Sequence, residues 1–316
     1  IYKAFKKLEY SLFDSADHIF FLTLHAIKLI SKQYPQIDKK SSVIRTCANP
    51  DTFYPINDLK QSSFLHIGYL GTIDTAYNYG YAEEKLGEIG VKDWNISSKF
   101  PSTSSNSLID IDNHITKKLT ESLIRLRVNK IENFFIHNRQ ELKNFDKIKK
   151  IFAVMENLKK RGLIKNIGCI VYDPEILKNI SKDFPINVIQ APANILDQRI
   201  FNSDNQRILK INKIKLELRS IFLQGLLFEK KKYFPQKLKK YYYIFENINK
   251  FFEKNKINRI NGLINFLKGK KFNRVIVGLR DVKELEEIIK NIKYKNFKTP
   301  NFKMNTKKTL INPYLW

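Results

Sequence analysis

Short apolar runs alternate with amphipathic stretches along most of the chain. The runs that predict strands are residues 73–80, 94–100, 130–138, 164–172, 186–194, 215–225 and 273–280. Between them, apolar residues recur at helical spacing, as in Ile115, Leu119, Leu123 and Leu126. Strands that alternate with helices in this way are typical of parallel β-α units.

The number of these units favours a closed barrel. Seven predicted strands, each followed by a helical or helix-compatible stretch, occupy residues 73–316. So many units in one stretch favour an eightfold (β/α) barrel over an open, doubly wound sheet. No strand is followed by the G-x-G-x-x-G pattern of a dinucleotide-binding Rossmann sheet. We therefore expect an α/β protein with a TIM-type (β/α)8 barrel.

Residues 230–271 allow two interpretations, because they are rich in Lys, Tyr and Phe. They could form a basic surface for an anionic partner. They could equally form the helix of a barrel unit, whose long side chains lay their apolar stems along the protein surface. We favour the helix.

The net charge does not change the predicted fold and is the next property to bear on binding partners. The 316 residues include 57 Lys and Arg and 31 Asp and Glu, which gives a formal net charge of +26. Such a charge is compatible with a nucleic-acid or membrane partner. However, the basic residues are spread along the chain without an Arg-rich stripe and interleaved aromatics. No apolar run reaches the roughly 18 residues of a membrane span. We expect neither partner.

Cysteine usage points to a reducing compartment. Cys47 and Cys169 lie far apart, and neither has metal-ligand spacing around it. Residues 1–17 carry charge throughout and contain no signal-peptide core. The sequence therefore predicts a cytoplasmic protein with no disulfide scaffold and no metal site.

Four polar residues stand at the ends of the first three predicted barrel strands: Asp74 and Tyr79, then Lys99, then His137. In a β/α barrel the carboxyl ends of the strands converge on the active site. A Tyr hydroxyl needs help to protonate a substrate oxygen at neutral pH, and a Lys ammonium held by an Asp provides it. A His adds a second donor to the same oxygen. Taken singly, each side chain is more often structural, but the set predicts carbonyl reduction by hydride from a nicotinamide.

Several motifs occur in a fixed order from residue 73 to the end. They include IDTAYNYGYAEEKLG, ISSKF, SLIRLRVNKIENFFIHN and VIQAPANILDQRI. These resemble the motifs DTAxxYGxSExxLG, xxTK, SLxRLxxDYIDLxxIH and xIQxPYNxLDxR of the aldo/keto reductase superfamily. The resemblance implies an oxidoreductase that reduces a small aldehyde or ketone with NADP or NAD. Some variants are similar to reductases of surface-polysaccharide pathways, which implies a sugar-related substrate.

The resemblance also implies residue roles. Tyr79 would be the general acid, Asp74 and Lys99 its tuning partners, and His137 the donor that orients the substrate. Gln190 would hold the nicotinamide carboxamide. The other implied cofactor contacts are Arg219 at the nicotinamide ring, Ser220, Leu223 and Gly225 at the pyrophosphate, and Gly278 and Arg280 at the adenosine phosphate.

Cofactor choice and one contact differ from the family pattern. Arg280 and Lys283 favour a 2′-phosphate, whereas Glu284 stands where some members have Arg, so NADP is only weakly preferred over NAD. The Ser that usually follows strand five is replaced by Ile170 and Val171. Loss of that hydrogen bond would cost about 1 kcal/mol of positioning.

Residues 1–72 have a different character. SADHIFFLT, VIRTCANPDTFYPI and FLHIGYLG predict a small α/β fragment. They resemble the domain junction of two-Rossmann-domain (GT-B type) glycosyltransferases, without the donor-binding carboxylates. We therefore predict two parts: a glycosyltransferase-like fragment at 1–72, and an aldo/keto reductase barrel at 73–316 that lacks its first strand and helix.

The missing unit raises the question of how the barrel closes. FLHIGYLG and IDTA are separated only by Gly71 and Thr72, whereas parallel neighbours need a crossover of a dozen or more residues. We expect them to form one long or bent strand. The earlier VIRTC strand is our candidate for the vacant place.

Two other function classes remain open. An inactive fusion or truncated product would keep the motifs but fail to complete the barrel, since unpaired strand edges beside an apolar interior favour misfolding. A nucleotide-sugar transferase agrees only with residues 1–72, which lack their own donor site.

Overall fold

The chain is described here from a computed structural model. The structure describes residues 19–21, 41–43, 82–92, 94–103, 107–108, 110–278, 282–291, 297, 300–304 and 307–316. Within these ranges strands and helices alternate from residue 82 onward, as the hydrophobic pattern predicts.

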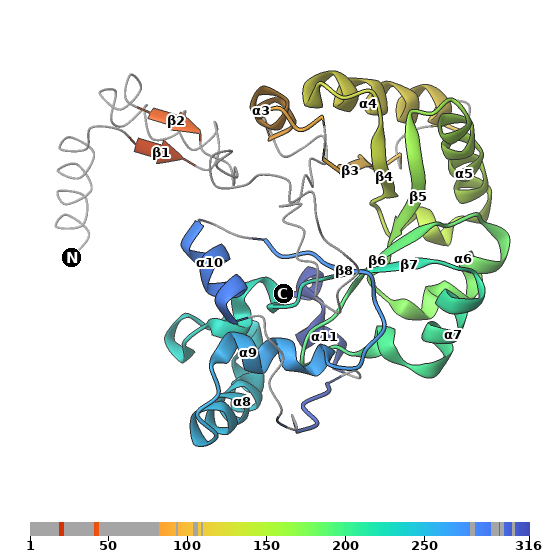
Figure 1. Ribbon diagram of the computed structural model, residues 1–316. Coiled ribbons are helices and arrows are strands. Elements are labelled where there is room, and N and C mark those ends of the chain that lie inside the picture. The colour runs from red at the N-terminus through yellow and green to blue at the C-terminus, as the bar shows by residue number, and fades with distance from the viewer. Residues whose placement is uncertain are drawn as a thin grey trace.

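Six parallel strands form the main sheet (Figure 1). They are β3 (Ser97–Phe100), β4 (Ile131–Ile136), β5 (Ile164–Ile170), β6 (Val188–Pro192), β7 (Lys215–Arg219) and β8 (Arg274–Val275). Each strand pairs in parallel with the next one along the chain. This sequential order is the arrangement of a β/α barrel.

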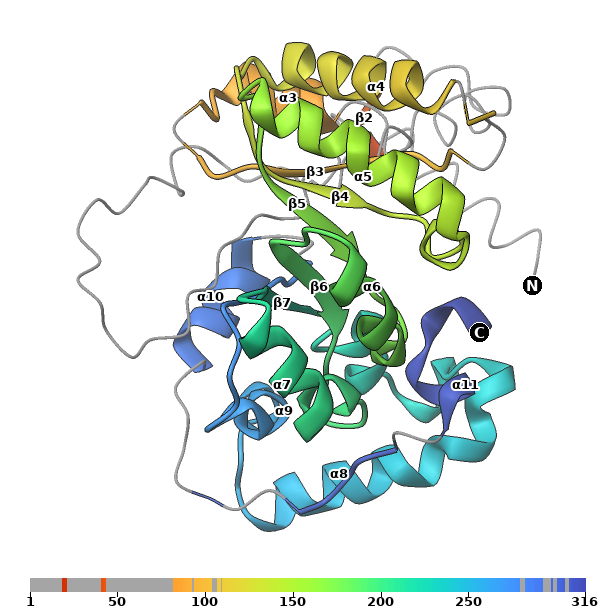
Figure 2. The same cartoon turned by 90° about the vertical axis from the view of Figure 1, so that its right-hand side faces the viewer.

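The helices of the described residues are α3 (Ala82–Ile89), α4 (Ile111–Leu126), α5 (Phe145–Lys160), α6 (Leu177–Asp183), α7 (Ser203–Ile211), α8 (Tyr242–Lys254), α9 (Arg259–Ile264), α10 (Val282–Asn291) and α11 (Lys308–Ile311). Of these, α4 to α7 lie along the outer face of the sheet (Figures 1 and 2). The apolar stripes are buried as predicted, for example Ile115 and Leu119 of α4 and Ile148 and Phe152 of α5.

The sheet curls so that its inner faces meet. Asn133 on β4 donates from Nδ2 to Oε1 of Glu217 on β7 at 3.3 Å, although two strands separate β4 from β7. The Arg219 guanidinium on β7 lies 4.3 Å from the centre of the Tyr172 ring, just beyond β5. A flat sheet would not bring these side chains together, so the strands form a barrel-like fold.

Asparagine side chains begin three of the helices. Asn144 accepts a hydrogen bond from the backbone N–H of Lys147 at α5. Asn202 and Asn258 cap α7 and α9 in the same way. Each cap satisfies an N–H that the helix itself cannot, which stabilises a helix by about 1 kcal/mol. The Asn-rich composition therefore helps to place the helix boundaries.

The last two strands are shorter than predicted. β7 ends at Arg219 because Ser220 has a left-handed backbone, with φ 59°, which does not continue a strand. β8 covers only Arg274 and Val275 of the expected 273–280 run. The first predicted barrel strand, residues 73–80, lies outside the described residues.

The N-terminal strands do not join the six-stranded sheet. β1 (Ile19–Phe21) and β2 (Ser41–Val43) pair in parallel with each other and form a sheet of their own. Of the VIRTC strand, which we proposed to complete the barrel, only Val43 is described; it belongs to the two-stranded sheet and pairs with Phe21, and the rest of the strand lies outside the described residues.

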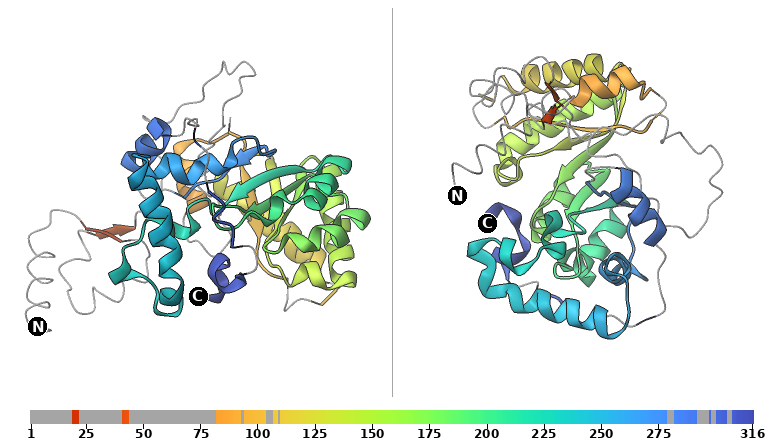
Figure 3. Two further views of the ribbon diagram at one scale, coloured as in Figure 1. Left: turned by 90° about the horizontal axis from the view of Figure 1, so that it is seen from below. Right: turned by 90° about the vertical axis from the view of Figure 1, so that its left-hand side faces the viewer.

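The basic segment at 230–271 forms α8 and α9, as we favoured. Ile244, Phe245, Ile248 and Phe252 form the buried side of α8. This helix lies on the opposite side of the molecule from α4 and α5 (Figures 2 and 3). Within the described ranges, no helix is long and apolar enough to span a bilayer.

We predict that Gly87→Ala destabilises the fold. Gly87 of α3 packs on the end of α4, and a Cβ there would overlap the carbonyl oxygen of Arg125. Overpacking against backbone is expected to lower the free energy of unfolding by about 1–3 kcal/mol, measured by urea denaturation. The exposed neighbour Lys85 is the control position, where Lys85→Ala should change this free energy by less than about 0.5 kcal/mol. Equal stability of the two variants would contradict the close helix contact.

Candidate active site

Lys99 and His137 leave adjacent strands on the inner face of the sheet. Lys99 is in register with Phe135 in the β3–β4 pair. His137 is two residues beyond Phe135, and side chains two apart along a strand point the same way. Lys99 is 4% exposed, and His137 is half-buried at the carboxyl end of β4. The prediction that strand ends bring these two residues together agrees with this placement.

Burial and nearby positive charge lower the pKa values of both Lys99 and His137. Burial, and then the Arg219 guanidinium, lower the pKa of Lys99 from 10.5 to about 7. Burial, followed by the charges of Lys99 and Arg219, lowers the pKa of His137 from 6.5 to about 4. At neutral pH, His137 is therefore an uncharged imidazole, and Lys99 is divided between its two protonation states.

Arg219 lies at the same site, with its guanidinium over the ring of Tyr172. Stacking on an aromatic face suits the planar guanidinium and holds it in place. The family resemblance implied a place for Arg219 at the nicotinamide but none for Tyr172. The signal was available, since Tyr172 is a polar aromatic residue at the end of the run at 164–172.

A buried hydrogen-bond network lies below these cations. Gln190 donates from Nε2 to Oε2 of Glu217 at 3.1 Å, and Asn133 donates both to Glu217 and to Ser97 Oγ. Arg274 Nη1 lies 3.6 Å from Glu217 Oε1. Burial raises the pKa of Glu217. Glu217 was not among the predicted site residues, although it lies two residues before Arg219 and therefore on the same face of β7.

The segment after β7 has an unusual backbone. Ser220, Leu223, Gln224 and Gly225 have φ values of 59°, 49°, 54° and 85°. Left-handed non-glycine residues cost about 1 kcal/mol or more each and cluster at functional sites. Successive backbone N–H groups in turns of this kind can form concavities that bind anions. The residues predicted for the pyrophosphate, Ser220, Leu223 and Gly225, all lie in this segment.

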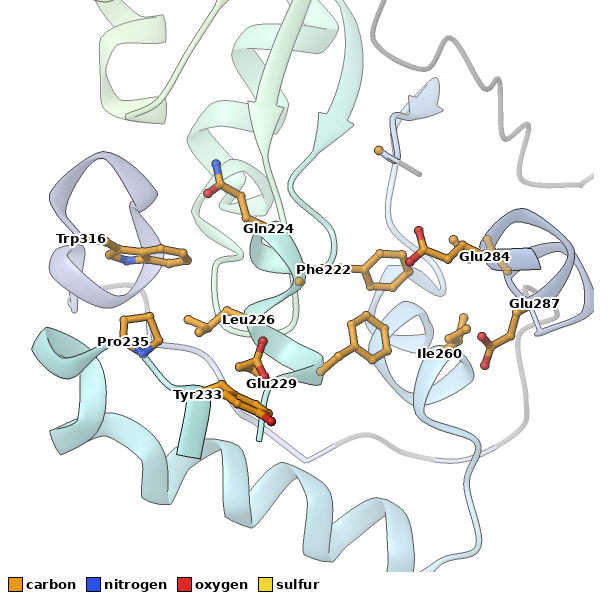
Figure 4. A pocket seen from close by; sticks show the side chains of 14 residues that line it. Phe222, Gln224, Leu226, Glu229, Tyr233, Pro235, Ile260, Glu284, Glu287 and Trp316 are labelled. Carbon is orange, nitrogen blue, oxygen red and sulfur yellow. The ribbon is translucent and has the colours of Figure 1, made fainter. Parts of the chain in front are cut away.

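A cavity of about 740 Å³ opens beside this segment. Gly225 and Gly278, predicted for different ends of the cofactor, both line it. Figure 4 shows Glu284 and Glu287 of α10 at one end of the cavity and Trp316 at the other. The volume is within the range of small-molecule sites. The glycines and the left-handed turn therefore fit a dinucleotide.

Three predicted site residues, Asp74, Tyr79 and Arg280, lie outside the described residues. Of the predicted catalytic four, the structure places Lys99 and His137 together. Of the predicted cofactor residues, it places Gln190 and Arg219 in the barrel interior, and Gly225 and Gly278 on the cavity.

We predict that His137 makes the protein acid-sensitive. The folded state keeps His137 neutral down to about pH 4, whereas the unfolded state takes up a proton near pH 6.5. Between these values the unfolded chain binds more protons, so the free energy of unfolding falls as pH is lowered. His137→Asn should remove about 1–3 kcal/mol of this fall, after allowance for partial solvent exposure. Urea denaturation from pH 7 to pH 4 measures it, and parallel curves for both proteins would refute it.

Comparison with known protein families supports the resemblance that the sequence motifs indicated. The model of the aldo/keto reductase family matches residues 62–308, a start somewhat before the boundary predicted at residue 73. No curated protein sequence matches the chain.

Solved structures of this family share the fold. Aldo-keto reductase AKR11C1 from Bacillus halodurans, in its apo form, is 16% identical with a TM-score of 0.53, covering 68% of this chain and 72% of that one. The glycerol dehydrogenase AKR11B4 from Gluconobacter oxydans is 18% identical with a TM-score of 0.54, covering 70% and 75%. The thermostable aldo-keto reductase Tm1743 is 21% identical with a TM-score of 0.52, covering 70% and 76%. With more than half of its length matched to the family model, the chain belongs to the aldo/keto reductase family.

Proposed function

We propose that this protein reduces an aldehyde or ketone with a nicotinamide dinucleotide as hydride source. The observation that carries the proposal is the placement of Lys99 on β3, in register with Phe135, beside His137 at the end of β4, with Arg219 close enough for its charge to act on both. Membership of an oxidoreductase family and the adjoining cavity of about 740 Å³ support it.

Each residue has a distinct part in this proposal. A bound nicotinamide would supply the hydride. Tyr79 would deliver the proton to the carbonyl oxygen, and Asp74 and Lys99 would adjust its pKa. His137, uncharged at neutral pH, would donate one hydrogen bond to the same oxygen without placing another full charge beside Lys99.

Other residues would hold the cofactor. Gln190 and Arg219 would contact the nicotinamide end. The backbone of Ser220, Leu223 and Gly225 would receive the pyrophosphate, because their left-handed turn is suited to anions. The adenosine end would be bound by Gly278 and Arg280.

The runner-up is an inactive product that keeps the motifs. One observation favours it: β3 and β8 are the two ends of the strand order, and neither pairs with a further strand among the described residues. The glycosyltransferase resemblance of residues 1–72, the sugar-related substrate and the cytoplasmic location remain predictions from the sequence.

Tyr79→Phe separates the two candidates. We predict that the unaltered chain and the variant both quench their protein fluorescence on binding NADH or NADPH, because the phenol oxygen is not needed to hold the cofactor. Reduction of a test aldehyde should fall in the variant by about 100-fold or more, since it lacks the proton donor. Absence of cofactor binding by both proteins would favour the inactive product.

The cofactor preference follows from the charge of the cavity. Glu229, Glu284 and Glu287 line it, and its described lining contains no Lys or Arg. A 2′-phosphate carries nearly two negative charges and would be repelled, whereas a carboxylate accepts hydrogen bonds from a free ribose diol. We therefore propose that Glu284 and Glu287 weaken the preference for NADP that Arg280 would give.

The test is a double variant, Glu284→Gln with Glu287→Gln. Removing both charges should raise the affinity for NADPH relative to NADH by about 3–10-fold, as exposed charge contacts contribute up to about 1 kcal/mol. Fluorescence titration with each cofactor measures the ratio. Glu88→Gln with Glu156→Gln, which removes two exposed carboxylates of α3 and α5 that do not line the cavity, is the matched control. An unchanged ratio in the cavity variant would refute the proposed role of the carboxylates.

A further inference from the structure

A second cavity, of about 280 Å³, lies at the carboxyl ends of the middle strands. Arg139 and Lys143 reach it from the loop after β4, Tyr172 and Asp173 from the loop after β5, and Arg199 from the loop after β6. Lys308 of α11 completes one side. In a β/α barrel this face carries the substrate, so the position of the cavity has functional meaning.

The lining of this cavity is strongly cationic. Arg139, Lys143, Arg199 and Lys308 are positive, and Asp173 is its one described acidic residue. Arg199 is largely neutralised by the buried Asp197, to which it binds through two hydrogen bonds of 2.9 Å. Even so, the three other basic side chains of the lining outnumber its one described carboxylate, Asp173. Guanidinium and ammonium groups around a concave surface bind carboxylate and phosphate.

The floor of the cavity is held in place. Beyond its bond to Asp197, Arg199 donates from Nη2 to the carbonyl oxygen of Tyr172 at 3.2 Å and lies 3.4 Å from Asp173 Oδ1. Lys308 Nζ lies 3.3 Å from Asp173 Oδ2, which ties the C-terminal segment to the loop after β5. A charged site with fixed walls loses less entropy when a ligand binds.

Two residues connect this cavity to the candidate active site. Tyr172 lines the cavity and lies under the Arg219 guanidinium, whose charge also acts on His137. Arg139 lies two residues after His137. A molecule with one end in the cavity would therefore have its other end near His137.

The high net charge of the protein does not explain this lining. The larger cavity of the same molecule has three carboxylates and no Lys or Arg in its described lining. The two cavities therefore differ in sign, although both belong to a chain with a formal charge of +26.

We infer that the smaller cavity binds an anionic group of the carbonyl substrate, a carboxylate or a phosphate, while the carbonyl lies at His137. This inference rests on the proposed function and names the class of substrate. The substrate would be a small aldehyde or ketone with a negative charge at its far end.

Matched pairs of compounds test the inference. The substrates are 4-carboxybenzaldehyde and benzaldehyde, compared by kcat/KM. The ligands are benzoate, phenyl phosphate and benzyl alcohol, compared by saturation-transfer NMR in the absence of cofactor. The cavity variant is Lys143→Gln with Lys308→Gln. The control variant is Lys210→Gln with Lys254→Gln, which removes the same charge from exposed positions that do not line the cavity.

We expect kcat/KM for the carboxylated aldehyde to exceed that for benzaldehyde by about tenfold, as contacts to charged groups predict. This ratio should approach one in the cavity variant and remain unchanged in the control. Benzoate or phenyl phosphate should bind more tightly than benzyl alcohol, and their comparison identifies the preferred anion.

Two results would overturn the inference in different ways. Equal reduction of both aldehydes, or a ratio that the cavity variant leaves unchanged, would refute the anion site while the proposed function stands. Reduction of neither aldehyde with NADH or NADPH would refute the proposed function, and the inference with it.

Discussion

Lys99 and Arg219 bring two like charges into a part of the barrel where water is scarce, and the properties of the site depend on their proximity. Burial makes the Lys99 ammonium lose its proton more readily, the Arg219 charge adds to this effect, and the pKa of Lys99 falls to about 7. Burial, followed by the charges of the same two cations, keeps His137 uncharged at neutral pH. A single electrostatic arrangement thus sets the protonation state of both groups that the structure brings together.

The surrounding side chains stabilise these two cations. Arg219 lies on the face of Tyr172, which supplies partial negative charge without a carboxylate. Below it, Glu217 accepts from Asn133 and Gln190, so the polar groups of three strands satisfy one another. Gly168 leaves room for the Phe135 ring, because a Cβ at that position would overlap the ring. The packed interior therefore holds the polar side chains at the carboxyl ends of the strands in fixed positions, and such preorganisation is typical of active sites.

Two cavities of opposite charge open near this scaffold. One is acidic, lies beside the left-handed turn at 220–225 and reaches α10. The other is basic and is built from the loops after β4, β5 and β6 with α11. Tyr172 lines the basic cavity, and Arg219, stacked on it, acts on Lys99 and His137. Under the proposed function, this division would give the cofactor and an anionic carbonyl compound separate binding sites.

Local pattern alone determined much of this protein. Apolar periodicity is a property of each segment by itself. It therefore predicted the six described barrel strands and the helices α4, α5 and α10, and it favoured a helix in the basic segment at 230–271. Parallel strands place their carboxyl ends on one face, and this rule was sufficient to pair Lys99 with His137. Tertiary structure decided the remaining contacts. It brought Glu217 to Asn133, Tyr172 to Arg219 and Lys308 to Asp173, and the residues of each pair are far apart in the chain. It also paired Val43 with Phe21 instead of with the barrel. Contacts of this kind depend on the curvature of the sheet and on which strand edges meet, and neither is encoded in the period of a single segment.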